Sequence, residues 1–114
     1  MSVRRGQIWW VEFGVPRGSG AGYRRPALVV QSNAFNESRI ATVMVAPLTS
    51  NLRLGDAPGN VLVTRRRSGL ARDSVVNVSL TSAVDRDRLV EHFGVLDDTV
   101  MQQVDRGLRE LLSL

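Results

Sequence analysis

Pro26-Ala27-Leu28-Val29-Val30-Gln31 is a continuous apolar run of strand length that directly follows a glycine-rich stretch. Such a run, bounded by a turn signal, is typical of a strand buried on both faces. Upstream, Gln7–Phe13 alternates with a period of two residues, which predicts a second strand. Downstream, Ile40–Pro47 is rich in β-branched residues and predicts a third.

Shorter segments complete the expected sheet. Asn60–Thr64 and Ser74–Leu80 predict two short strands, and Arg86–Leu96 predicts a short turn followed by a strand. Gly14–Arg25 and Leu48–Gly59 are expected to be loops, because glycine, proline and small polar residues gather in them. A helical turn is expected within Ser32–Ser38 and a tight turn at Arg65–Gly69.

The chain is expected to end in a helix that Asp97 or Asp98 caps. Its apolar residues fall at three- and four-residue steps and form one stripe, which we expect to close the sheet: Val100, Met101, Val104, Leu108, Leu111 and Leu112. Asp105 and Arg109 stand one turn apart and are expected to pair. Gly107 indicates either a close approach to the sheet or a tolerated accident.

Five or more short strands and one closing helix predict a mainly β fold with a C-terminal helix, built as a small, strongly bent sheet or barrel. A length of 114 residues suits one core, so we expect residues 1–114 to form a single domain.

Several kinds of chemistry are excluded by composition. The chain has no cysteine, so it has neither disulfides nor a thiolate metal site. Its one histidine, His92, excludes a His-based zinc site and is interpreted as an ordinary strand residue. No phosphate-binding loop or dinucleotide fingerprint is present, so we expect no metal and no cofactor. No segment resembles a secretory signal or a membrane span, and we expect a cytoplasmic protein.

The charge is divided unevenly along a chain whose net charge is +4. Residues 1–72 carry eleven Arg against Glu12, Glu37 and Asp56, a net charge of +8. Residues 73–114 carry four Arg against eight acids, a net charge of −4. This division favours a surface that faces a polyanion, although a merely solvated surface remains the alternative.

Candidate site residues stand where the expected loops meet the expected strands. Arg25 directly precedes Pro26, which restricts the Arg25 backbone to extended conformations and suits a guanidinium aimed at one phosphate. Thr49, Ser50 and Asn51 follow the third expected strand, where function is commonly carried. A surface arginine and an ordinary polar turn are the alternatives.

A second group follows further along the chain. Arg65, Arg67 and Arg72 flank the tight turn and are candidates for phosphate contacts, the alternative being solvated charge. Asp73 and Ser74 open the next expected strand. Asn77 and Ser79 share one face of it, where they could read base edges or simply face solvent at a sheet edge.

At these junctions the chain resembles the MazF/PemK family of bacterial toxin–antitoxin systems over nearly its full length. The resemblance rests on these runs in this order: Arg5-Gly6-Gln7-Ile8-Trp9-Trp10-Val11, Gly18-Ser19, Arg24-Arg25-Pro26-Ala27-Leu28-Val29-Val30-Gln31, Pro47-Leu48-Thr49-Ser50-Asn51, Gly69-Leu70, Asp73-Ser74-Val75-Val76-Asn77-Val78-Ser79 and Val104-Asp105-Arg106-Gly107-Leu108.

The resemblance implies an SH3-like barrel of the MazF/PemK/CcdB type that forms a homodimer. It implies a toxin that cleaves single-stranded RNA in a sequence-selective way and is controlled by a small acidic, MazE-like antitoxin. The family's catalytic roles fall on Arg25 and Thr49. With the residue pattern, it gives this expected RNA-binding set: Ser19, Arg24, Ser50, Asn51, Arg53, Arg65, Arg67, Arg72, Asp73, Ser74, Asn77 and Ser79.

Two positions depart from the family pattern. Gly20 stands where the family often has an acid, and Leu80 stands where it often has Gln. Both changes concern base contacts more than catalysis, and we expect them to alter which RNA sequence is cut.

RNA can be cut without a metal if the ribose 2′-hydroxyl attacks the adjacent phosphate, since the protein then supplies only positioning and charge stabilisation. Arg25 is assigned to the phosphate, with proton transfer by Arg25 left open, and Thr49 is assigned a hydrogen bond to the same group. Two rival hypotheses are a nucleic-acid-binding module without catalysis and a gyrase-poisoning toxin of the CcdB type. Only 5% of residues are aromatic, which disfavours the first, and the family runs around Arg25 and Thr49 disfavour the second.

Overall fold

Residues 2–114 are described by the structure, a computed structural model, and their seven strands form one antiparallel sheet arranged around β3 (Thr42–Thr49). The strand order is β4-β5-β3-β2-β1-β7, with β6 also paired to β3. The other strands are β1 (Gln7–Glu12), β2 (Arg24–Val29), β4 (Val61–Val63), β5 (Ser74–Val76), β6 (Ser82–Asp85) and β7 (Leu89–Val95). The helices are α1 (Asn33–Asn36), α2 (Arg65–Ser68) and α3 (Asp98–Leu112), and single 3₁₀ turns are η1 (Leu52–Asp56), η2 (Val78–Leu80) and η3 (Arg86–Arg88).

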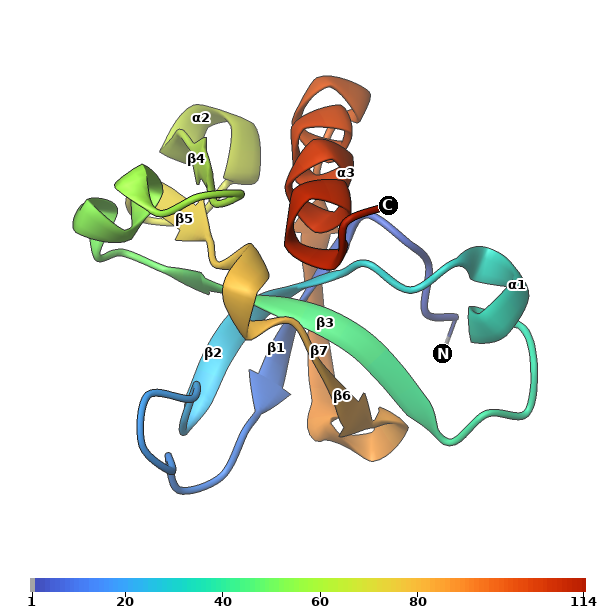
Figure 1. The fold of residues 1–114 in the computed structure, drawn as a ribbon. Coiled ribbons are helices and arrows are strands. Elements are labelled where there is room, and N and C mark those ends of the chain that lie inside the picture. Colours follow the sequence, from blue (N-terminus) through green and yellow to red (C-terminus); the bar gives the residue numbers. More distant parts are fainter. Residues whose placement is uncertain (1) are drawn as a thin grey trace.

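β3 bends the sheet because it changes partners along its length. Its first half pairs with β6, its middle pairs with β2, and its last two residues pair with β5. β4 and β7 remain at the two ends, so the expected barrel is an open, strongly bent sheet. α3 stands beside β4 (Figure 1) and also contacts η2. This confirms a mainly β fold with a C-terminal helix.

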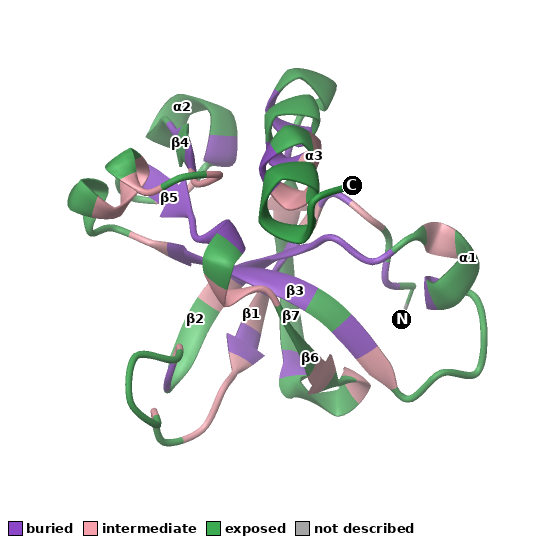
Figure 2. Cartoon of the chain, viewed as in Figure 1, coloured by how far each residue is buried: buried purple, intermediate pink, exposed green. Residues whose placement is uncertain are grey.

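The two faces of the central strands are buried in two separate cores. Leu28 of β2 and Ala46 of β3 join α3 residues in one core, whereas Ala27 and Val29 of β2 join Val45 of β3 in the other. The prediction that Pro26–Gln31 lies buried on both faces is therefore confirmed, and Figure 2 shows the buried stretch of β3 at the centre of the molecule. Each fully buried Val or Leu contributes about 1.5–3 kcal/mol of transfer free energy.

The expected strand over Ser74–Leu80 is wrong in its second half. β5 ends at Val76, and the Asn77 N–H makes the last bond to β3, donating to the Pro47 carbonyl at 2.8 Å. The next N–H, that of Val78, donates to the Asn60 side chain at 2.9 Å and not to a neighbouring strand. Asn77 and Ser79 therefore lie at a turn and not on one strand face. β6 was not anticipated, since its residues are mostly exposed and show no apolar period.

Two expectations for α3 need correction, although its cap is confirmed, since the Asp97 carboxylate accepts the Val100 N–H at 3.0 Å. Asp105 pairs with Arg5 at 2.5 Å and not with Arg109, which ties the N-terminal segment to the helix. The apolar stripe covers the core only in part: Leu111 and Leu112 are 48% and 59% exposed. Among the helices of residues 2–114, none has the length and apolar character needed to cross a bilayer.

Gly107 marks the point where α3 touches the turn before β4. A Cβ at Gly107 would overlap the Gly59 carbonyl oxygen and lie 3.0 Å from the Gly59 carbonyl carbon. Gly59 itself has a φ of +80°, which an L side chain rarely adopts, so a side chain at either glycine would be strained at this contact. The close approach therefore explains Gly107, and the neighbour is the turn and not the sheet.

We expect Gly107→Ala to lower the free energy of unfolding by about 1–2 kcal/mol, because overpacking against backbone outweighs the roughly 1 kcal/mol that Ala gains over Gly in a helix. Urea denaturation measures the change. Gly55→Ala is the matched control, since its Cβ would meet only the Val75 side chain, at 3.6 Å. Equal stabilities for wild type and Gly107→Ala would contradict this account.

Candidate active site

A cavity of about 490 Å³ brings together residues from five parts of the chain. It lies where the β1–β2 loop, β2, the end of β3, η1 and η2 meet. Its lining holds six of the residues expected from the sequence: Ser19, Arg25, Thr49, Asn51, Asn77 and Ser79. The other lining residues are Gly20, Ala21, Pro47, Leu54, Ala57, Asn60 and Leu80.

Arg25 and Thr49 meet because of the register between β2 and β3. Ala27 pairs with Pro47 in an antiparallel ladder, so the same register carried two residues further puts Arg25 opposite Thr49. Residues two apart on a strand share a face. The two predicted catalytic side chains therefore lie on the face of Ala27 and Pro47, at the edge of the second core.

Arg25 is the second residue of β2, opposite Val11 of β1, so it lies near the strand start as expected, with the strand beginning two residues earlier than Pro26. Its Nε donates to the Gly22 carbonyl at 3.0 Å, which orients the guanidinium. The ion pairs among residues 2–114 do not include Arg25. Its terminal N–H groups are therefore available to an anion, and a guanidinium fork matches the geometry of a phosphate.

Thr49 ends β3 with its hydroxyl available as a donor. Its Oγ1 accepts the Asn51 N–H at 3.2 Å, so the hydroxyl hydrogen is not used in that contact. Asn51 in turn accepts the Arg53 N–H and caps η1. The local turn thus holds Thr49 so that its hydrogen can point into the cavity.

The opposite wall is a hydrogen-bonded set of neutral side chains. Asn60 donates to Asn77 Oδ1 at 3.2 Å, and the Ser79 hydroxyl donates to the same oxygen at 2.9 Å. Asn60 was not anticipated as a site residue, because an asparagine beside Gly59 is indistinguishable in sequence from an ordinary turn residue.

Arg25 is the only charged residue among the described residues that line the cavity. No three His, Cys, Asp or Glu residues gather where they could hold a metal ion, within residues 2–114. His92 lies on β7, where its Nε2 is 3.1 Å from the Gly94 carbonyl oxygen and its ring packs against Trp9. The donor set of the cavity thus suits an anion held by one guanidinium.

A second, smaller cavity of about 300 Å³ collects part of the predicted arginine group. It is lined by Ser50, Leu52, Arg65, Ala71, Arg72 and Asp73. Asp73 accepts the Arg65 backbone N–H at 2.7 Å and so fixes the start of α2. Thr49 lines the larger cavity and Ser50 the smaller one, so the two cavities meet the chain at consecutive residues at the end of β3.

Four other predicted residues lie outside both cavities. The Arg24 guanidinium lies 5.4 Å from the Trp10 ring centroid and pairs with Glu91, and Arg67 pairs with Asp97 at 3.6 Å. Ser74 is buried and donates to the Arg72 carbonyl. Arg53 is exposed on η1.

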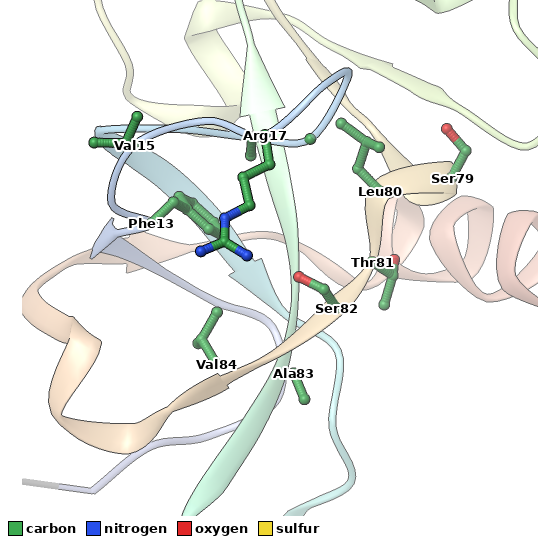
Figure 3. Close-up of a pocket in the computed structure, with 11 residues that line it drawn as sticks. Phe13, Val15, Arg17, Ser79, Leu80, Thr81, Ser82, Ala83 and Val84 are labelled. Carbon is green, nitrogen blue, oxygen red and sulfur yellow. The ribbon is translucent and has the colours of Figure 1, made fainter.

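A groove of about 820 Å³ adjoins the cavity and shares its lining of Gly20, Ala21, Ser79 and Leu80. Figure 3 shows Arg17 reaching over this groove towards Ser82, with Phe13 and Val84 beside it. Gly20 and Leu80, the two departures noted above, therefore lie where the cavity opens into the groove.

Comparisons with known proteins agree with this geometry. Residues 4–112 match the family model described as PemK-like, MazF-like toxin of type II toxin-antitoxin system. The chain is 43% identical, over the full length of both chains, to endoribonuclease MazF6 of Mycobacterium tuberculosis. The crystal structure of MazF from Deinococcus radiodurans is 26% identical, with a TM-score of 0.82 and coverage of 100% of this chain and 99% of that chain.

A MazE-MazF crystal structure from the same organism is 25% identical, with a TM-score of 0.77 and the same coverage of both chains. The cavity with Arg25 and Thr49, the open, bent sheet packed against α3 and the match over residues 4–112 lead to one conclusion: the chain belongs to the PemK-like, MazF-like toxin family of type II toxin-antitoxin systems.

Proposed function

We propose that this protein is a metal-independent endoribonuclease toxin that cuts single-stranded RNA in a sequence-selective way. The observation that carries the proposal is the meeting of Arg25 and Thr49 in one cavity, where Arg25 is the only charged residue among the described residues of the lining. The related proteins named as endoribonucleases support the reaction type.

The proposed reaction uses a nucleophile that the substrate itself provides. The 2′-hydroxyl oxygen attacks phosphorus, the bond from phosphorus to the 5′ oxygen breaks, and the proton lost from the 2′-hydroxyl is balanced by one gained at the 5′ oxygen. Arg25 stabilises the charge that builds on the phosphate oxygens, and Thr49 donates to one of them. His92 lies on β7, outside the cavity lining, and takes no part.

RNA is proposed to run over the end of β3, through both cavities. Arg65 and Arg72 would hold phosphates beside Ser50, while Asn77 and Ser79 would contact bases in the larger cavity. Phosphate contacts contribute affinity without sequence information, whereas base contacts specify. Arg17 is placed to hold a further phosphate along the adjoining groove.

We further propose that residues 1–114 act as one domain in the cytoplasm, as a homodimer that a small acidic, MazE-like antitoxin inhibits. The MazE-MazF structure supports a protein partner. Pairing is supported by exposed apolar side chains, since Leu62 of β4 is 56% exposed and Leu111 and Leu112 of α3 are 48% and 59% exposed. Burial of such side chains is a common driving force for association.

The first prediction concerns the reaction products. RNA incubated with the protein in EDTA should be cut to fragments that carry a 2′,3′-cyclic phosphate and a 5′-hydroxyl, because the nucleophile is the adjacent ribose hydroxyl. Mass spectrometry of the fragments identifies both ends. A requirement for added magnesium, 5′-phosphate ends, or binding without any cleavage would each reject the proposal.

The second prediction concerns the two catalytic residues. Arg25→Ala should lower the cleavage rate about a hundredfold or more, the usual effect of removing one donor to developing charge. Arg25→Lys should restore little, since an ammonium cannot reproduce the fork. Thr49→Ala should lose activity and Thr49→Ser should keep part of it.

Arg39→Ala is the matched control, since it removes the same charge from an exposed residue before the opposite end of β3. Circular dichroism checks that each variant is folded. A folded Arg25→Ala protein that cuts RNA at the wild-type rate would remove Arg25 from the mechanism.

The third prediction concerns the antitoxin. The basic surface contributed by residues 1–72 should attract an acidic, flexible segment that folds on binding and blocks the RNA path. In a titration with 2′-O-methyl RNA, which cannot be cut, the MazE-like protein encoded beside this gene should displace the RNA, and salt should slow its association. A ternary complex with full RNA affinity would overturn the competitive model.

A further inference from the structure

Asn60 is held in one orientation by backbone groups on both ends of its amide. Its Oδ1 accepts the Val78 N–H at 2.9 Å, and its Nδ2 donates to the Leu54 carbonyl at 2.9 Å. A backbone N–H can only donate and a backbone carbonyl can only accept. Turning the Asn60 amide over would therefore break both bonds, so the side chain has one permitted orientation.

The orientation of the Asn60 amide determines the orientation of the Asn77 amide. The second hydrogen of Asn60 Nδ2 points to Asn77 at 3.2 Å, so the Asn77 atom that faces Asn60 must be the acceptor, Oδ1. The Ser79 hydroxyl donates to the same oxygen at 2.9 Å. Ser79 thereby uses its one hydrogen, and its oxygen can only accept from a ligand.

The other end of the Asn77 amide has no partner among the described residues. Nδ2 makes no hydrogen bond within residues 2–114, although every fully buried side-chain nitrogen and oxygen there has a partner. Nδ2 must therefore reach the surface, and Asn77, which is only 6% exposed, lines the cavity of Arg25 and Thr49. An almost fully buried donor that is left open to a cavity is placed to meet a ligand acceptor.

We infer that Asn60 is a specificity-determining positioning residue, which makes Asn77 a donor and Ser79 an acceptor towards one nucleobase of the substrate. The inference rests on the proposed function. A base and not a phosphate is the occupant, because this wall is neutral and its neighbours Pro47, Leu54 and Leu80 are apolar. The Arg25 guanidinium on the other wall is left for the phosphate.

The inference predicts an exchange of isosteric bases. With Asn60→Asp, the carboxylate still accepts the Val78 N–H but repels Asn77 Oδ1, so the Asn77 amide turns over and presents Oδ1 to the cavity. Ser79 then recovers its hydrogen and donates. Asn77 then accepts and Ser79 donates, the reverse of the wild type. The preferred base at one position of the cleavage site should therefore change from uracil to cytosine or the reverse, or from guanine to adenine or the reverse.

The experiment cuts a pool of random RNA with each purified protein and sequences the fragment ends. Asn60→Asp should change the preference within one such base pair by about tenfold or more, the usual effect of leaving a buried polar group unpaired. Asn60→Ala leaves Asn77 free to turn and should relax the preference. Asn77→Asp presents an acceptor where the wild type presents a donor, while Ser79 still donates to the carboxylate and remains an acceptor, so the wild-type preference within that base pair should be lost; this variant carries the test if Asn60→Asp does not fold.

Asn33→Asp, which adds the same charge at α1, is the matched control and should keep the wild-type preference. Unchanged preference in Asn60→Asp and Asn77→Asp, with cleavage intact, would overturn the inference. A uniform loss of rate over all sequences would also overturn it, because Asn77 would then serve the phosphate. Absence of cleavage by the wild type would instead reject the proposed function.

Discussion

Burial of the β2–β3 pair on both faces is the constraint on which the rest of the structure depends. Successive side chains of each strand enter different cores, so a slip of one residue would put each set into the core that is shaped for the other. The register is therefore strongly specified, and the same register sets Arg25 opposite Thr49. The geometry of the active site is in this sense a by-product of how the core is packed.

The cavity separates two tasks between its walls. One wall holds the Arg25 guanidinium and the Thr49 hydroxyl, each oriented by a hydrogen bond to nearby backbone, and it suits the charged phosphate. The other wall is neutral, and its side chains are oriented by bonds that begin at the backbone of η1 and η2. Because each wall belongs to a different part of the fold, the proposed function would allow base selectivity to change without disturbing the proposed catalytic groups.

The strands with strong apolar patterns were predictable, and so was the terminal helix with its cap at Asp97. The sequence predictions were wrong where a side chain bonded to a backbone group or where a residue's partner lay far away in sequence. Asn60 accepts the Val78 N–H, so the β5 ladder does not continue beyond Asn77. Asp105 forms its ion pair with Arg5 and not with Arg109, the partner expected from the sequence. β6 has no apolar period, since it only adds to the edge of a sheet whose cores are already filled.

The sequence by itself determined the class of the fold and the kind of chemistry, because apolar periodicity and side-chain type are local properties of the chain. It identified Arg25 and Thr49 as candidates, and it excluded cysteine and multi-histidine sites. Only the tertiary structure decided which of the predicted polar residues share a cavity, that Arg67 pairs with Asp97, and that Asn60 belongs to the site. Those facts depend on contacts between segments far apart in the chain. The orientation of a side-chain amide likewise follows from the hydrogen-bond partners that the fold places around it.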